Sequence, residues 1–110
     1  MIEQLRIYAI EPSLKKEFDD RFRLHASRIM RSYGFDIKAM WYSEGSDNTE
    51  FVYILRWADQ STMKQQWDLF MADEEWTAIK NSSREQYGEM VLGKVKDQIL
   101  TEVDWFKNLI

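Results

Sequence analysis

The only histidine of the chain, His25, stands between two arginines at helical spacing. Arg21 precedes it by four residues and Arg28 follows it by three, so one flank of a helix can carry all three side chains. Two neighbouring cations favour the neutral imidazole and attract an anion. The triplet therefore predicts a catalytic proton acceptor, His25, beside an enolate, phenolate or carboxylate that Arg21 or Arg28 would bind.

His25 could also be a core residue or a metal ligand, and the sequence supports the first of these roles better than the second. A half-buried core histidine, hydrogen-bonded to a strand or to a tyrosine hydroxyl, fits the same spacing and stays open. A metal site lacks ligands, because no carboxylate stands three or four residues from His25 and the chain has no second histidine. We therefore expect no metal. We also expect no cofactor.

The two arginines differ in their local partners. Glu17, four residues before Arg21, can pair with it along one helix face. No acidic residue stands three or four positions from Arg28. We therefore expect Arg28 to bind either a distant carboxylate or a ligand.

Composition and motifs exclude several classes of protein. The 110 residues fit one domain, and a net charge of -4 argues against a nucleic-acid partner. The absence of cysteine removes disulfides and thiol nucleophiles. The sequence contains no GxSxG motif, glycine-rich phosphate loop or HExxH motif. It therefore lacks the motifs of serine hydrolases, nucleotide-binding proteins and zincins.

Signals for secretion or membrane insertion are also missing from the sequence. The first residues, MIEQLRIYAI, carry charges inside their apolar run, and the longest apolar run, FVYIL, is far too short to span a bilayer. We expect a cytoplasmic protein with no membrane partner.

The first half of the chain reads as a strand, a helix and a hairpin. Residues 4–10 mix β-branched and aromatic residues, as strands do. Apolar residues then recur at the spacing of one helix face, before Gly34 ends the helix: Leu14, Phe18, Phe22, Ile29 and Tyr33. Residues 35–57 alternate apolar and polar positions around a turn, which predicts a hairpin.

The second half reads as two helices and a strand. Candidate helix caps are Asp59, Ser61 and Thr62 for the second helix, and Asp73 for a short third helix. Ser82 and Ser83 are expected in a loop, and residues 89–95 (EMVLGKV) in a fourth strand. The order strand, helix, strand, strand, helix, strand predicts an α+β fold: a ferredoxin-like βαββαβ sandwich with one antiparallel sheet.

The third predicted strand indicates a homodimer. One face carries Phe51, Tyr53, Leu55 and Trp57, and the other carries Val52 and Ile54, so both faces require burial. A second copy packed against the helix-free face would supply the cover. A monomer whose C-terminal tail wraps that face is the alternative, and in either case we expect the tail to pack rather than project.

Three segments together resemble the NIPSNAP family, one branch of the dimeric α/β-barrel superfamily: EFDDRFRLHASRIMRSYGF, MWYSEGSDNTEFVYILRW and STMKQQWDLFMADEEWTAIK. The similarity extends over nearly the entire chain. It implies a ferredoxin-like fold, a homodimer built by sheet-to-sheet packing, and a cavity in each subunit between the sheet and its helices. Related branches include cofactor-independent monooxygenases, haem-handling proteins, lactone isomerases and ligand-sensing domains.

Depending on which strand face turns inward, aromatic side chains of the sheet would line this cavity and bind the ligand: Tyr8, Trp41, Tyr53 and Trp57. The expected ligand is a small apolar or aromatic molecule with an acidic group. Two functions stay open. One is a cofactor-independent monooxygenase or isomerase with His25 as acid or base. The other is a non-catalytic ligand-binding or assembly module.

Overall fold

The structure, a computed structural model, describes residues 1–45 and 48–109. In chain order its elements are β1 (Ile2–Ile10), the 3-10 turn η1 (Pro12–Leu14), α1 (Lys15–Arg21), the π-helical turn η2 (Phe22–Ala26), α2 (Ser27–Ser32), β2 (Asp36–Glu44), β3 (Thr49–Trp57), α3 (Gln60–Met71), α4 (Glu74–Tyr87), β4 (Val91–Leu100) and the 3-10 turn η3 (Phe106–Asn108). Residues 46 and 47, in the middle of the predicted hairpin turn, lie outside the described residues.

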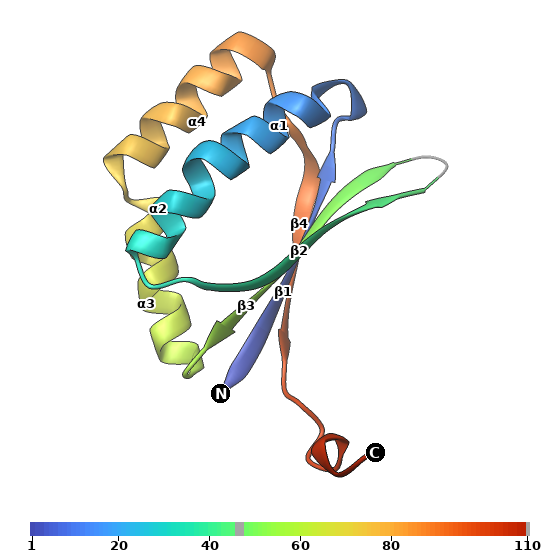
Figure 1. Ribbon diagram of the computed structural model, residues 1–110. Coiled ribbons are helices and arrows are strands. Elements are labelled where there is room, and N and C mark those ends of the chain that lie inside the picture. Colours follow the sequence, from blue (N-terminus) through green and yellow to red (C-terminus); the bar gives the residue numbers. More distant parts are fainter. Residues whose placement is uncertain (46–47, 110) are drawn as a thin grey trace.

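The four strands form one antiparallel sheet in the order β2-β3-β1-β4. All the α-helices lie on one side of this sheet, as Figure 1 shows, and its other side carries no helix. This arrangement confirms the predicted ferredoxin-like α+β fold.

Residue parity in β3 decides which side chains enter the core. Burial alternates strictly along the strand, and Phe51, Tyr53, Leu55 and Trp57 are the buried residues that face the helices. The elements α1, η2 and α2 follow one another without a break and are called the first helical region below. Its residues Phe18, Phe22 and Met30 pack against this strand.

Both predicted acidic helix caps are confirmed. The Asp59 carboxylate accepts a hydrogen bond from the Thr62 amide, and the Asp73 carboxylate accepts one from the Trp76 amide. The third helix, however, is not short: α4 runs for 14 residues and includes Ser82 and Ser83, which were wrongly expected in a loop.

On the helix-free side of the sheet, six apolar residues form two adjacent rows. Cross-strand register aligns Trp41, Val52 and Ile7 in one row and Ala39, Ile54 and Leu5 in the next. These six residues are called the open face below. Polar neighbours bound the rows, including Glu3 and Arg56, which form an ion pair at 2.8 Å.

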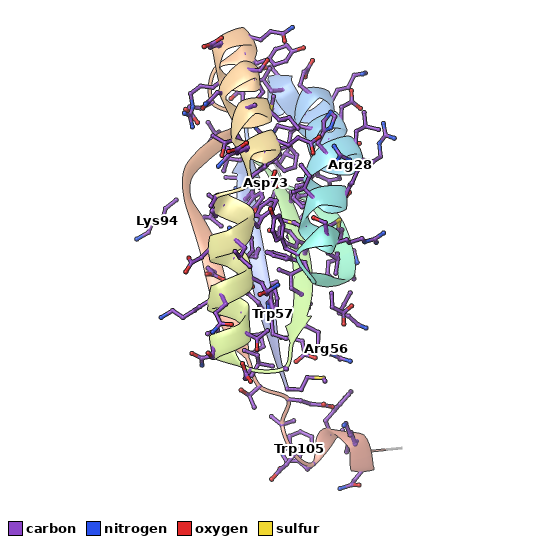
Figure 2. All side chains as sticks on the ribbon, turned by 90° about the vertical axis from the view of Figure 1, so that its left-hand side faces the viewer. Arg28, Arg56, Trp57, Asp73, Lys94 and Trp105 are labelled. Carbon is purple, nitrogen blue, oxygen red and sulfur yellow. The ribbon has the colours of Figure 1, made fainter. Side chains whose placement is uncertain are left out.

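The tail, residues 101–109, does not pack on its own domain, contrary to expectation. β4 continues to Leu100, and the tail then leaves the sheet beyond its end (Figure 1). In Figure 2, Trp105 lies clear of both the sheet and the helices. Trp105 and Phe106 keep 58% and 57% of their surface exposed. Among the described residues, no helix combines the length and apolarity needed to cross a membrane.

Candidate functional site

A π-helical turn interrupts the first helical region where His25 stands. The amide of Ser27 bonds to the carbonyl of Phe22, five residues earlier. Phe18, Phe22 and Ala26 are buried at steps of four residues, and each such step overshoots a turn of an α-helix by about 40°. The wider π turn absorbs this drift, so the buried face stays on the sheet. Turns of this kind occur frequently at functional sites.

The same turn places His25 away from the sheet. Its side chain is half-buried and lines an open groove between α1, the π turn and α4. Arg28 Nη2 lies 3.2 Å from His25 Nδ1. Because a guanidinium can only donate, this hydrogen bond requires Nδ1 to accept, and the neutral ring then carries its proton on Nε2. His25 thereby offers a donor, Nε2–H.

Arg28 has the distant carboxylate that its sequence context predicted. It donates to both carboxylate oxygens of Glu75 at the start of α4, at 3.1 and 2.8 Å. These hydrogen bonds hold the pKa of the Glu75 carboxyl below its usual value. Arg28 is therefore already balanced by a negative charge.

Arg21 has a different environment. It donates to the Ser83 hydroxyl at 2.8 Å and lies over the Trp76 ring, 5.6 Å from its centroid. Within the part of the chain that the structure describes, no carboxylate lies within ion-pair distance of Arg21, so the predicted pair with Glu17 does not form. Burial lowers the pKa of Arg21, while Tyr8 and Glu89 act in the opposite direction and the charge of Arg84 adds to the lowering. Arg21 is a partly desolvated cation without an ion-pair partner among the described residues.

These side chains line one groove of about 600 Å³, called the helical groove below. Its lining donors include Lys16, Arg21, His25 and Gln86, whereas the Ser83 hydroxyl donates to the Lys80 carbonyl. The carboxylates of its lining are Glu17, Asp20 and Glu75, and one buried oxygen of Glu17 lacks a hydrogen-bond partner among the described residues. Its apolar lining consists of Leu24, Ala78, Ile79, Tyr87 and Met90. The volume suits a small molecule.

Three of the four predicted aromatic residues face the helices but lie below the groove, in the core. The Tyr8 and Tyr53 hydroxyls are 2.6 Å apart, and burial raises the pKa of Tyr53 well above its usual value, so its hydroxyl stays neutral. Trp57 donates its indole N–H to Gln4 at 3.0 Å. The space expected to be a cavity under the first helix is filled here by these side chains.

Trp41 lies on the other side of the sheet. It is paired with Val52 in register, belongs to the open face and is 51% exposed. It therefore points away from Tyr8, Tyr53 and Trp57, which face the helices.

Sequence reasoning missed Ser83 and Glu75 as partners of the two arginines. Ser83 is seven residues after Trp76 and four after Ile79, so a helix continued through it would have placed it on the buried flank of α4. No sequence signal links Glu75 to Arg28, because the contact joins separate elements. Among the described residues, no cluster of three metal-ligating side chains occurs.

Comparison with known proteins gives consistent results. The NIPSNAP family model matches residues 2–107. A NIPSNAP family protein of Agrobacterium tumefaciens superposes with a TM-score of 0.80 at 14% identity, with 94% of each chain covered. An uncharacterised NIPSNAP-like domain protein of Burkholderia xenovorans gives 0.77 at 18% identity, covering 94% of this chain and 86% of that one.

A more distant fold neighbour is a putative antibiotic biosynthesis monooxygenase of Nitrosomonas europaea. Its TM-score is 0.60 at 10% identity, with 94% of this chain and 99% of the other covered. At such identities the likeness concerns the fold alone. The search of curated proteins returned no match.

Proposed function

Because the chain belongs to the NIPSNAP family and carries Arg21 and His25 on one open groove, we propose that it is a homodimer that binds a small acidic molecule with an apolar body in the helical groove. The observation that carries the proposal is the state of Arg21. This cation is partly removed from water, and its polar partner is the neutral Ser83 hydroxyl. A bound carboxylate would supply the missing counter-charge.

His25 supports the same ligand. Its Nε2–H can donate to an acidic oxygen, while Leu24, Ile79 and Tyr87 contact the apolar body. A hydroxyl on the ligand would satisfy Glu17. In a catalytic version of this function, His25 donates a hydrogen bond from Nε2 to an oxygen that gains negative charge in the reaction. It does not accept a proton there, because Nδ1 is engaged by Arg28 and Nε2 already carries its proton.

The reaction class is a separate part of the proposal, because the fold alone does not determine it. A cofactor-independent oxygenation or isomerisation of an acidic molecule is the catalytic version that we propose. If a substrate is found, His25→Ala should abolish turnover without lowering the melting temperature. In a non-catalytic binding module, the same substitution would weaken binding alone. A large loss of thermal stability instead would identify His25 as a packing residue.

Calorimetric titration with octanoate and with 1-octanol tests the binding proposal, because the two probes share a chain and differ in charge. We expect octanoate to bind more tightly, and Arg21→Gln to remove this preference. Lys64→Gln removes one positive charge from exposed α3 surface, outside the groove, and should leave the preference intact. Equal affinities for the two probes, or equal effects of the two variants, would refute the proposal.

The homodimer is proposed from the open face. Two adjacent apolar rows on a sheet without covering helices favour burial against an equivalent surface. The exposed apolar side chains of the tail would gain a partner in the same assembly. Sedimentation at micromolar concentration should give the mass of two chains. Ile54→Lys should give monomers, whereas Leu69→Lys, on exposed α3 surface, should not. A monomeric parent chain would end this part of the proposal.

A further inference from the structure

A second hollow lies at the β2 edge of the molecule, between the sheet and the first helical region. Its volume is about 500 Å³, and it is called the β2 slot below. Its apolar lining consists of Phe22, Ile37, Ala39, Met40, Trp41, Tyr42 and Phe51. The rings of Phe22 and Tyr42 have centroids 4.8 and 5.2 Å from that of Phe51. The slot therefore has an aromatic wall.

Positive charge surrounds this wall. Arg23, Arg31 and Lys38 line the slot, and Asp19 is the one carboxylate among its lining residues. The Asp19 carboxylate already accepts a hydrogen bond from the Tyr42 hydroxyl at 2.7 Å and pairs with Arg23 at 3.6 Å. Three cations against one engaged carboxylate leave a positive excess in a chain whose net charge is -4.

The two cations away from Asp19 differ in their partners. Lys38 lies 3.7 Å from Asp36, and both side chains are largely exposed, so this pair is weak. Arg31 forms no ion pair within the described part of the chain. No acidic residue stands three or four positions from Arg31 in the sequence. The same lack of a local acidic partner distinguished Arg28 in the sequence analysis.

Two backbone irregularities flank the slot. The pairing of β2 with β3 shifts between Ile37 and Ala39, which makes Lys38 the extra residue of a β-bulge. The π turn supplies Phe22 and Arg23 from the opposite wall. Bulges re-aim side chains and, like π turns, are over-represented beside binding and active sites.

We propose that the β2 slot is a binding site for a flat aromatic anion, with the ring against Tyr42 and Phe51 and the acidic group between Arg31 and Lys38. Burial and the bond to Asp19 raise the pKa of Tyr42, so its hydroxyl stays neutral and does not oppose an anion. The slot shares no lining residue with the helical groove. Most of its lining lies on the helix side of the sheet, while Ala39 and Trp41 also belong to the open face, so a dimer formed through that face would border the slot.

A pair of fluorescent probes tests this site. 1-Anilinonaphthalene-8-sulfonate and N-phenyl-1-naphthylamine share their rings, and the second lacks the sulfonate. We expect the sulfonate to bind more tightly to the full chain, and Arg31→Gln with Lys38→Gln to weaken it about tenfold, the effect of losing a charge-assisted hydrogen bond. The neutral probe should bind the parent and this variant alike.

Two control variants separate the slot from general attraction. Lys64→Gln with Lys94→Gln removes the same charge from α3 and β4 and should leave the sulfonate affinity unchanged. Ser27→Leu narrows the slot without changing its charge and should weaken both probes. Equal binding of the two probes to the parent chain, or equal losses in the two charge variants, would overturn the proposal. Circular dichroism and thermal melting should show each variant folded before its affinity is compared.

Discussion

Arg28 and Glu75 join the first helical region to the start of α4 through two hydrogen bonds, although 47 residues separate them in the sequence. The pair lies at the surface, with about half of each side chain exposed. Surface pairs contribute little to stability. The ion pair acts locally, because it holds the Arg28 guanidinium in a position from which Nη2 donates a hydrogen bond to His25 Nδ1.

Removal of Arg28 should therefore change the tautomer of His25 more than the stability of the fold. In the parent chain we expect the neutral ring to be protonated on Nε2, because Nδ1 accepts from Arg28. In Arg28→Ala a mixture of tautomers should appear. Nitrogen-15 NMR of the imidazole distinguishes the two forms. Arg31→Ala, three residues further on, serves as the control, and a mixture in the parent chain would contradict the assignment.

Gln4 should be far more important for stability than its polarity suggests. Its side-chain oxygen accepts the indole N–H groups of Trp57 and Trp67 at 3.0 and 2.8 Å, and its amide donates to Asp97 at 2.8 Å. Gln4→Leu would leave both indole groups without an acceptor, so we expect a loss of about 2–4 kcal/mol in urea denaturation. Gln65→Leu on exposed α3 surface should cost little. If Gln4→Leu and Gln65→Leu both caused only a small loss in the free energy of unfolding, water would replace the Gln4 amide as the partner of the two indoles.

Asp73 should make stability depend on acid pH. Its carboxylate accepts from the Trp76 amide and from the Tyr33 hydroxyl, and these bonds hold its pKa below the usual value. A carboxyl with a lowered folded-state pKa contributes stability above its unfolded-state pKa, about 3.9, and loses it as pH falls through the folded value. Asp73→Ala should thus lower the melting temperature at pH 7.

The difference between the parent and Asp73→Ala should shrink in acid. Melting curves at pH 7 and pH 2.5 measure it. Tyr33→Phe removes the hydrogen bond from the Tyr33 hydroxyl and keeps the helix cap. At pH 7 it should therefore lower the melting temperature less than Asp73→Ala does. A difference that stays constant down to pH 2.5 would contradict the role of the ionised carboxylate.

The fold was predictable from sequence because its signals are local. Each of these signals acts within a few residues: the β-branched and aromatic residues of β1, the apolar run of β3, the caps at Asp59 and Asp73, and the stop at Gly34. The length of α4 was underestimated, since Ser82 and Ser83 were interpreted as loop residues although buried Trp76 anchors the helix that contains them.

The site was less predictable, because it depends on a local exception and on distant contacts. A regular helix would place His25 at the border of the sheet-facing side, and the π turn at Phe22–Ala26 turns it toward α4 instead. The pairing of β2 with β3 decides which face of the sheet each residue occupies, and it places Trp41 and Tyr53 on opposite faces. Neither strand alone gives this information. The β2 slot joins β2 to the first helical region in the same way.

The tail should contribute to the proposed dimer. Trp105 and Phe106 are exposed in the single chain, and their burial against a second copy would favour association. Trp105→Ala with Phe106→Ala should therefore raise the dissociation constant of the dimer about tenfold or more. Leu69→Ala with Met71→Ala, at exposed positions of α3, is the matched control. An unchanged dissociation constant would place the tail outside the interface.

NMR mapping of octanoate binding on the isotope-labelled chain tests the central proposal most directly. The proposal predicts the largest shifts at the His25 imidazole and at the amides of Leu24, Ser82 and Ser83, and predicts that Arg21→Gln abolishes them. Shifts confined to the open face at Leu5, Val52 and Ile54, or shifts that persist in Arg21→Gln, would contradict it.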